Sequence, residues 1–171
     1  MGSMTSSTSP VTATGPALFD SFGVPLAPGT SVGLVMMNKT PGFTFARGTV
    51  VGAGEQLSFD VSEYRDQYGQ VVEQPSLSNA AAPMVTVLRE QSAAFGAEIG
   101  LTDVFGSAVR FGDHAAFLLW DGAERVALGR GAVTGVHDGM VSLIANGSAV
   151  ARVRDGQRVL APSTTMFRLA L

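Results

Sequence analysis

The sequence repeats itself at a spacing of 83 residues, and this repeat constrains the fold more than any other feature. Residues 18–52 align with residues 101–135 without a gap. The identical positions of the first copy are Leu18, Asp20, Phe22, Gly23, Gly29, Arg47, Gly48, Val50 and Gly52. Where the residues differ, apolar character is kept, as in Leu34 with Phe117 and Met37 with Trp120. Such a repeat predicts two units with the same fold.

Short β-rich runs alternate with turn residues inside each copy. Residues 30–37 and 43–51 flank a turn, and residues 56–62 alternate so that Leu57, Phe59 and Val61 share one face. The second copy repeats this order, with strands expected near 114–120, 125–136, 140–144, 149–153 and 165–171. About five short strands in each copy are typical of small SH3-like or OB-like barrels.

These patterns predict a mainly all-β protein formed by tandem duplication of a small five-stranded barrel-like unit, with a pseudo-twofold relation between the copies. The alternative is a single ten-stranded sandwich or barrel. We expect the first β repeat at residues 17–88 and the second at residues 101–171. The spacing of Leu88, Phe95 and Ile99 favours a short connecting helix over residues 89–100.

Two further matches extend the repeat towards the end of each copy. The run Gly-Gln-x-Val at Gly69 recurs at Gly156, and the run Met-Val-Thr-Val-Leu from Met84 corresponds to Met-Phe-Arg-Leu-Ala from Met166. We also expect a hairpin turn at Asn146-Gly147, because this pair of residues favours tight turns between strands.

The N-terminal residues 1–16 are predicted to lie outside the folded units. Met1-Gly-Ser-Met is typical of a tag remnant, and residues 5–16 carry no charge and almost no large apolar side chain. Such a segment buries too little apolar surface to offset the entropy of ordering, so we expect a disordered arm. The alternative is an arm that becomes ordered on a neighbouring subunit.

Composition excludes several classes of function. The formal net charge is -3 and the 11 Lys and Arg residues are spread along the chain, so nucleic acid is not an expected partner. The absence of cysteine excludes disulfides, thiolate metal sites and cysteine nucleophiles. No signal peptide and no run of about 20 apolar residues is present, so we expect a soluble, intracellular protein without a membrane partner.

Arg47 and Arg130 occupy the same position in the two copies, each followed by glycine and a strand. A pair of guanidinium groups could bind an anionic ligand or a carboxylate of a partner. The alternative, which the repeat favours, is that each arginine supports its own copy through the matching residues Asp20 and Asp103.

The two histidines each adjoin an aspartate, in the pairs Asp113-His114 and His137-Asp138. Together they could form a metal site or an acid-base pair, but their spacing fits no known ligand motif. The alternative is that they are solvated residues near turns. No catalytic residue, resident metal or cofactor is predicted, because no nucleophile, phosphate-loop or metalloprotease motif is present.

The run Leu-x-Asp-x-Phe-Gly, followed by Leu-Leu-Trp-Asp-Gly-Ala-Glu-Arg-Val-Ala-Leu-Gly-Arg-Gly, resembles repeated β-rich domains in plant transposon-derived proteins. This resemblance implies no activity. The sequence favours a non-enzymatic binding or assembly module that presents a protein-interaction surface, with a protein partner or self-association. The alternative is a small-molecule or metal-binding protein, or an enzyme, with a pocket between the two repeats.

Overall fold

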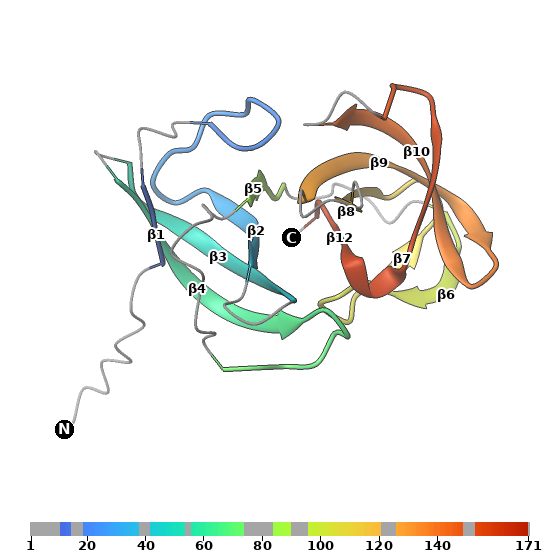
Figure 1. Cartoon of the computed structure of the whole chain (residues 1–171), viewed down its shortest axis with the longest axis horizontal. Coiled ribbons are helices and arrows are strands. Elements are labelled where there is room, and N and C mark those ends of the chain that lie inside the picture. Colours follow the sequence, from blue (N-terminus) through green and yellow to red (C-terminus); the bar gives the residue numbers. More distant parts are fainter. Residues whose placement is uncertain are drawn as a thin grey trace.

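The protein is a β structure in the computed structural model, which describes residues 11–14, 19–37, 42–53, 56–73, 84–89, 96–120, 126–148 and 153–170 (Figure 1). The prediction of a mainly all-β chain is confirmed. The strands are β1 (Val11–Thr14), β2 (Ser31–Met37), β3 (Phe43–Ala53), β4 (Gln56–Asp66), β5 (Met84–Val87), β6 (Glu98–Thr102), β7 (Ala108–Arg110), β8 (His114–Trp120), β9 (Val126–His137), β10 (Met140–Ser148), β11 (Arg158–Ala161) and β12 (Met166–Arg168). A 3-10 turn, η1 (Ser163–Thr165), precedes β12.

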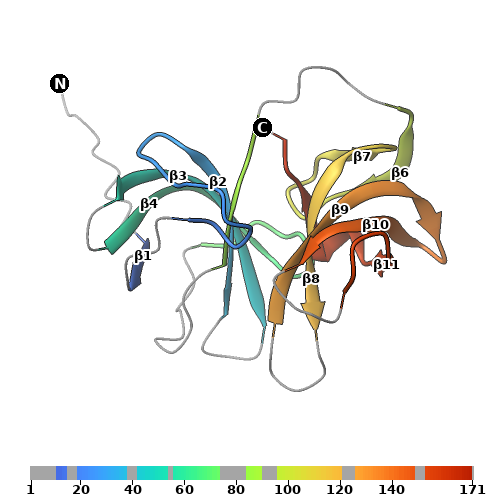
Figure 2. The same ribbon diagram turned by 90° about the horizontal axis from the view of Figure 1, so that it is seen from above.

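Two five-stranded antiparallel sheets lie side by side (Figures 1 and 2). The first half of the molecule, residues 11–89, has the strand order β1-β4-β3-β2-β5. The second half, residues 96–170, has the order β11-β10-β9-β8-β12 and an additional pair, β6 and β7. Among the described strands neither large sheet joins its ends, so the prediction of barrel-like units is not confirmed.

The predicted connecting helix is not found in the described part of its range. Residues 98–100 belong to β6, which pairs with β7, and residues 90–95 lie outside the described residues. Gly96 and Gly100 have φ angles of 59° and 81°, in the left-handed region that ends a helix. No helix in the described ranges is long and apolar enough to cross a membrane.

The predicted arm also contains regular structure. Val11–Thr14 forms β1, which pairs with the edge of β4, whereas residues 1–10 and 15–16 lie outside the described residues. The prediction of disorder was based only on the small apolar surface that the arm's side chains could bury. An open sheet edge instead offers backbone hydrogen bonds, which need no apolar side chain.

The recurring Asp-x-Phe-Gly motif forms the same turn in both halves. The Oδ1 atom of Asp20 accepts hydrogen bonds from the backbone N–H groups of Phe22 and Val24, and its Oδ2 atom accepts one from Val87. Each half closes this turn with a glycine in the left-handed region, at φ angles of 79° and 80°. The carboxylate therefore ties the turn to the last strand of its sheet.

Asp103 makes the equivalent bonds in the second half. Its Oδ1 atom accepts from the N–H groups of Phe105 and Ser107, and its Oδ2 atom accepts from the N–H of Arg168. Burial raises the pKa of Asp103, although these three hydrogen bonds and the nearby charge of Arg47 favour the ionised form. The motif is thus explained by local structure in both halves.

The two halves share an apolar core where they meet. One buried cluster belongs to the first half and one to the second, while a third joins side chains from both. The main members of the shared cluster are Val35, Phe43, Phe45, Leu88, Val104, Phe105, Ala116, Leu128 and Phe167. The sheets therefore bury a continuous apolar surface between them, which stabilises their arrangement.

Contacts across this junction are reciprocal. The guanidinium carbon of Arg47 lies 4.4 Å from the centre of the Phe105 ring, and that of Arg130 lies 4.7 Å from the centre of the Phe22 ring. Each arginine thus places its charge on an aromatic face of the other half, an attraction of about 0.5–2 kcal/mol. The arginine of each half therefore contacts the Asp-x-Phe-Gly phenylalanine of the other half.

Candidate functional site

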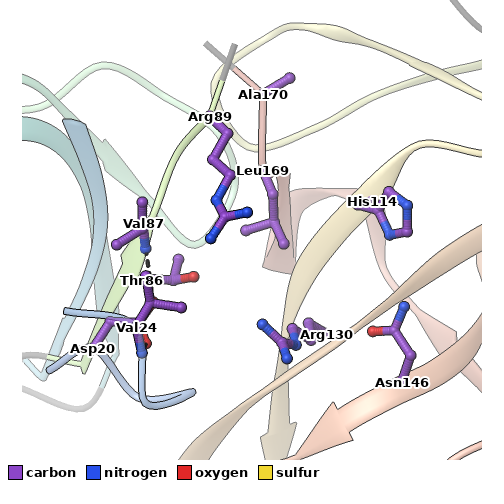
Figure 3. A pocket seen from close by; sticks show the side chains of 10 residues that line it. All are labelled: Asp20, Val24, Thr86, Val87, Arg89, His114, Arg130, Asn146, Leu169 and Ala170. Carbon is purple, nitrogen blue, oxygen red and sulfur yellow. Dashed lines mark hydrogen bonds between the residues drawn. The ribbon is translucent and has the colours of Figure 1, made fainter. Parts of the chain in front are cut away.

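A cleft of about 590 Å³ lies between the two halves (Figure 3). A volume of this size is within the usual range for small-molecule sites. Its first-half wall comes from the turn that begins at Asp20, from β5 and from Arg89, two residues after the end of β5. Its second-half wall comes from β8, β9, β10 and the C-terminal residues. The lining residues are Asp20, Val24, Thr86, Val87, Arg89, His114, Arg130, Asn146, Leu169 and Ala170.

Two guanidinium groups enter the cleft from different elements. Arg130 projects from β9, and Arg89 follows β5, where its backbone N–H donates to the carbonyl of Leu169 at 2.9 Å. Figure 3 shows both side chains extending into the space between the halves. Among the described residues, no carboxylate forms an ion pair with either group. Arg89 and Arg130 therefore bring two positive charges to the cleft.

Arg47, the counterpart of Arg130, is in a different electrostatic environment. Arg47 is opposite Glu63 in the β3–β4 register and forms an ion pair with it at 2.9 Å. Arg130 is opposite Gly147 in the β9–β10 register, and glycine has no side chain to pair with it. The two arginines share a backbone position and an aromatic contact, but only Arg47 has a cross-strand carboxylate.

Asn146 reaches the cleft because β10 contains a bulge. The register of β10 with β9 shifts between Ala145 and Gly147, so Asn146 has no opposite residue. Asn146-Gly147 is therefore not the predicted hairpin turn, because the strand continues to Ser148. A bulge redirects a side chain out of the regular alternation. Figure 3 shows the Asn146 amide and the His114 ring along the second-half wall.

Apart from Thr86, the remaining lining residues are apolar or already bonded. The carboxylate of Asp20 accepts three backbone N–H groups, so its oxygens hold the turn together. Val24, Val87 and Leu169 supply apolar surface beside the polar groups. The cleft thus combines hydrogen-bond donors from Arg89, Arg130, His114 and Asn146 with an apolar wall. That combination suits a ligand with an acidic group attached to an apolar body.

The structure does not bring the predicted histidine and aspartate residues together. Only His114 lines the cleft. Asp113 is 1% exposed and forms an ion pair with Arg168 at 3.0 Å, while its Oδ2 atom also accepts the backbone N–H of Arg110. His137 and Asp138 lie at the exposed turn between β9 and β10 and contact each other at 3.3 Å.

Arg89 and Asn146, which bring hydrogen-bond donors to the cleft, were not predicted as site residues. Asn146 had a usable signal, because an Asn-Gly pair within a β-rich run is compatible with a bulge as well as a turn. Arg89 had none, since it belongs to no motif and its position depends on how the halves meet. Among the described residues, no group of three or more His, Asp or Glu side chains could hold a metal ion.

No family model, curated protein or solved structure matches the chain. The resemblance to plant transposon-derived domains gains no support from these comparisons.

The cluster of Arg47, Glu63 and Arg65 gives a prediction for pH dependence. Burial tends to raise the pKa of Glu63, but the hydrogen bonds and charges of the two arginines outweigh it, so the pKa lies below its usual value of 4.5. The ionised carboxylate of Glu63 therefore contributes its full stabilisation above pH 4.5, the pKa of the unfolded state. This contribution is lost as the pH falls through the lower pKa of the folded state. We expect Glu63→Gln to be less stable than the parent protein at neutral pH.

Urea unfolding at a series of pH values would measure the difference in unfolding free energy between the two proteins. This difference should stay constant near neutral pH and shrink on acidification below pH 4.5. Glu98→Gln is a suitable control, because Glu98 is 56% exposed in its ion pair with Arg110. A difference for Glu63→Gln that grows on acidification would contradict the prediction.

Proposed function

We propose that this protein is a non-enzymatic binding module that holds an acidic group of a small ligand in the cleft between its halves. The observation that carries this proposal is the difference between Arg130 and Arg47. A cross-strand carboxylate neutralises Arg47, whereas Arg130 is opposite glycine and faces the cleft together with Arg89. Guanidinium groups bind carboxylate and phosphate well, because their N–H groups match two oxygens at once.

We also infer that the two halves arose by duplication of one β unit. Three features support this inference: the aligned sequence repeat, the same Asp-x-Phe-Gly turn and the reciprocal arginine contacts. Duplication explains why the cleft lies at the junction, since a paired unit creates a surface that a single unit lacks. Later divergence, such as the loss of a carboxylate opposite Arg130, would then specialise one side of the junction.

The direct test is a titration of the isotope-labelled protein with inorganic phosphate and with citrate, followed by NMR. We expect saturable shifts in the Nε–H signals of Arg89 and Arg130 and in backbone signals of β9. Arg130→Gln should weaken binding by about 10-fold or more, because a hydrogen bond to a charged group contributes about 1.5–3 kcal/mol. The affinity would be obtained from the shifts at low ionic strength, where screening is weak.

Arg47→Gln is the matched control, because it removes the counterpart arginine from the side where Glu63 already pairs with it. This variant should bind both probes as the parent protein does. Equal losses in the two variants would indicate non-specific attraction to positive charge. That result, or the absence of saturable shifts with either probe, would overturn the proposal.

A further inference from the structure

The edge strands β1 and β11 take equivalent positions in the two sheets but come from different parts of the chain. Strand β1 pairs antiparallel with β4, with Val11 opposite Phe59 and Thr14 opposite Gln56. In the second sheet the same edge position, beside β10, belongs to β11. Strand β11 comes from the chain that follows β10, whereas β1 comes from the N-terminal arm, before β2 (Figure 2).

The registers show that β1 and β11 occupy equivalent places. Phe59 is opposite Val50 in the first sheet, and Leu143 is opposite Val133 in the second. Val50 and Val133 are aligned in the repeat, and each donates its N–H to the residue before β2 or β8, at 2.9 Å. Val11, opposite Phe59, therefore occupies the place of Val159, which is opposite Leu143.

The first half does not fill this edge with the segment that follows β4, because β4 is longer than β10. Strand β4 continues to Asp66, and the returning chain pairs there, with Val71 bridging to Arg65 and the N–H of Val72 donating to Tyr64. In the second half the return occurs earlier, where the N–H of Gly156 donates to Ala145, and leads into β11. The edge at Gln56–Phe59 is thus left for the arm.

We propose that the β4 edge over Gln56–Phe59 is a strand-acceptor site, and that the N-terminal arm of a second copy of this chain can occupy it in place of β1. The two copies would then exchange β1 strands. The strand suits exchange because β1 lies at the edge of the sheet, where it pairs with β4 alone among the described strands, and because only four residues, 15–18, join it to Phe19. Short hinge loops are sites at which strand exchange between copies arises.

Exchange would keep every backbone pairing of β1 and would be symmetric, since each copy gives and receives the same strand. That reciprocity closes a dimer and prevents an open chain of copies. The arm brings no charge to the edge, so pairing buries none. Its residues 11–13, Val-Thr-Ala, also resemble residues 159–161, Val-Leu-Ala, which fill the equivalent place. The edge therefore fits this strand better than an arbitrary peptide.

Cysteine cross-linking can test the exchange, because the chain contains no cysteine of its own. Thr12 is opposite Ser58 in the β1–β4 register. Equal amounts of Thr12→Cys and Ser58→Cys proteins would be mixed, incubated and oxidised. We expect a disulfide-linked dimer that contains one chain of each kind, and light scattering of the parent protein should show a dimer fraction that rises with concentration.

The control mixture combines Thr12→Cys with Gln157→Cys, which places the second thiol on an exposed turn of the other half. It should give only background cross-linking. The double variant Thr12→Cys/Ser58→Cys reports the arrangement within one chain. If this variant yields only monomer with an internal disulfide and the mixed single variants do not cross-link, exchange is ruled out. The cleft takes no part in the exchange, so that failure would leave the proposed function standing.

Discussion

Replacing Phe167 by alanine is expected to lower the free energy of unfolding by about 3–5 kcal/mol, as removal of a large buried aromatic side chain usually does. The Phe167 ring is fully buried at the junction and meets Phe45 and Phe105 edge to face, with ring centres 6.3 and 5.7 Å apart. It also lies against the backbone of β2, since a Cβ atom on Gly33 would be 2.4 Å from it. Its loss would open a cavity between the halves.

Urea unfolding monitored by circular dichroism would measure this loss and would also show whether the halves still unfold together. Leu143→Ala is the matched control, because Leu143 is fully buried but belongs to the core of the second half alone. We expect both variants to be destabilised and only Phe167→Ala to separate the transitions of the halves. A cost below about 1 kcal/mol for Phe167→Ala, far under the usual range, would contradict its role at the junction.

The position of Phe167 also explains why the cleft lies on one side of the junction. Thr86 is opposite Gly33 in the β2–β5 register, and Phe167 is opposite Ala116 in the β8–β12 register. Gly33 and Ala116 are aligned in the repeat, so Thr86 and Phe167 are equivalent. The large ring fills its side of the junction, whereas the small Thr86 lines the cleft. The difference between Phe167 and Thr86 therefore leaves room for the cleft on one side of the junction only.

Sequence patterns predicted the local features of the fold well. The central strands β2, β3, β8 and β9 follow from β-rich runs between turn residues, and the Asp-x-Phe-Gly motif that recurs in the repeat forms the same turn in both halves. The edge strands β1 and β11 were harder to predict, because their pairing depends on which backbone N–H and C=O groups of β4 and β10 are left without a partner strand. The register also aligns Val85 with Met166, one residue away from the predicted match of Met84.

The candidate site was less predictable, because it depends on differences between the halves. The repeat drew attention to Arg47 and Arg130 as a pair, and they do share an aromatic contact. It could not show that the residue opposite Arg130 is glycine, since register shifts at bulges move the partner positions. The contribution of Arg89 depends on how two distant segments meet, and no short-range pattern encodes that.

Replacing Gly131 by alanine is expected to cost about 2–3 kcal/mol of unfolding free energy, because overpacking a tight site typically costs 1–3 kcal/mol. A Cβ atom on Gly131 would lie 2.5 Å from the carbonyl oxygen of Ile144 and 3.2 Å from the Cα of Ala145. Both contacts are backbone atoms of β10, so relief requires the two strands to separate next to the Asn146 bulge. Gly48, the aligned residue, has the same contact at 2.4 Å with the carbonyl of Asp60.

Thermal and urea unfolding should therefore show similar losses of unfolding free energy for Gly131→Ala and Gly48→Ala, since both clashes follow from the same local geometry. Gly52→Ala is the control: among the described neighbours its Cβ would meet only the Ser58 hydroxyl, at 3.3 Å, and a side chain can move aside. We expect that variant to keep nearly the parent stability. Because Gly131 adjoins Arg130, its substitution should also weaken phosphate binding, whereas Gly48→Ala should not. A stable Gly131→Ala protein would show that β9 and β10 are less closely packed beside the cleft than the structure indicates.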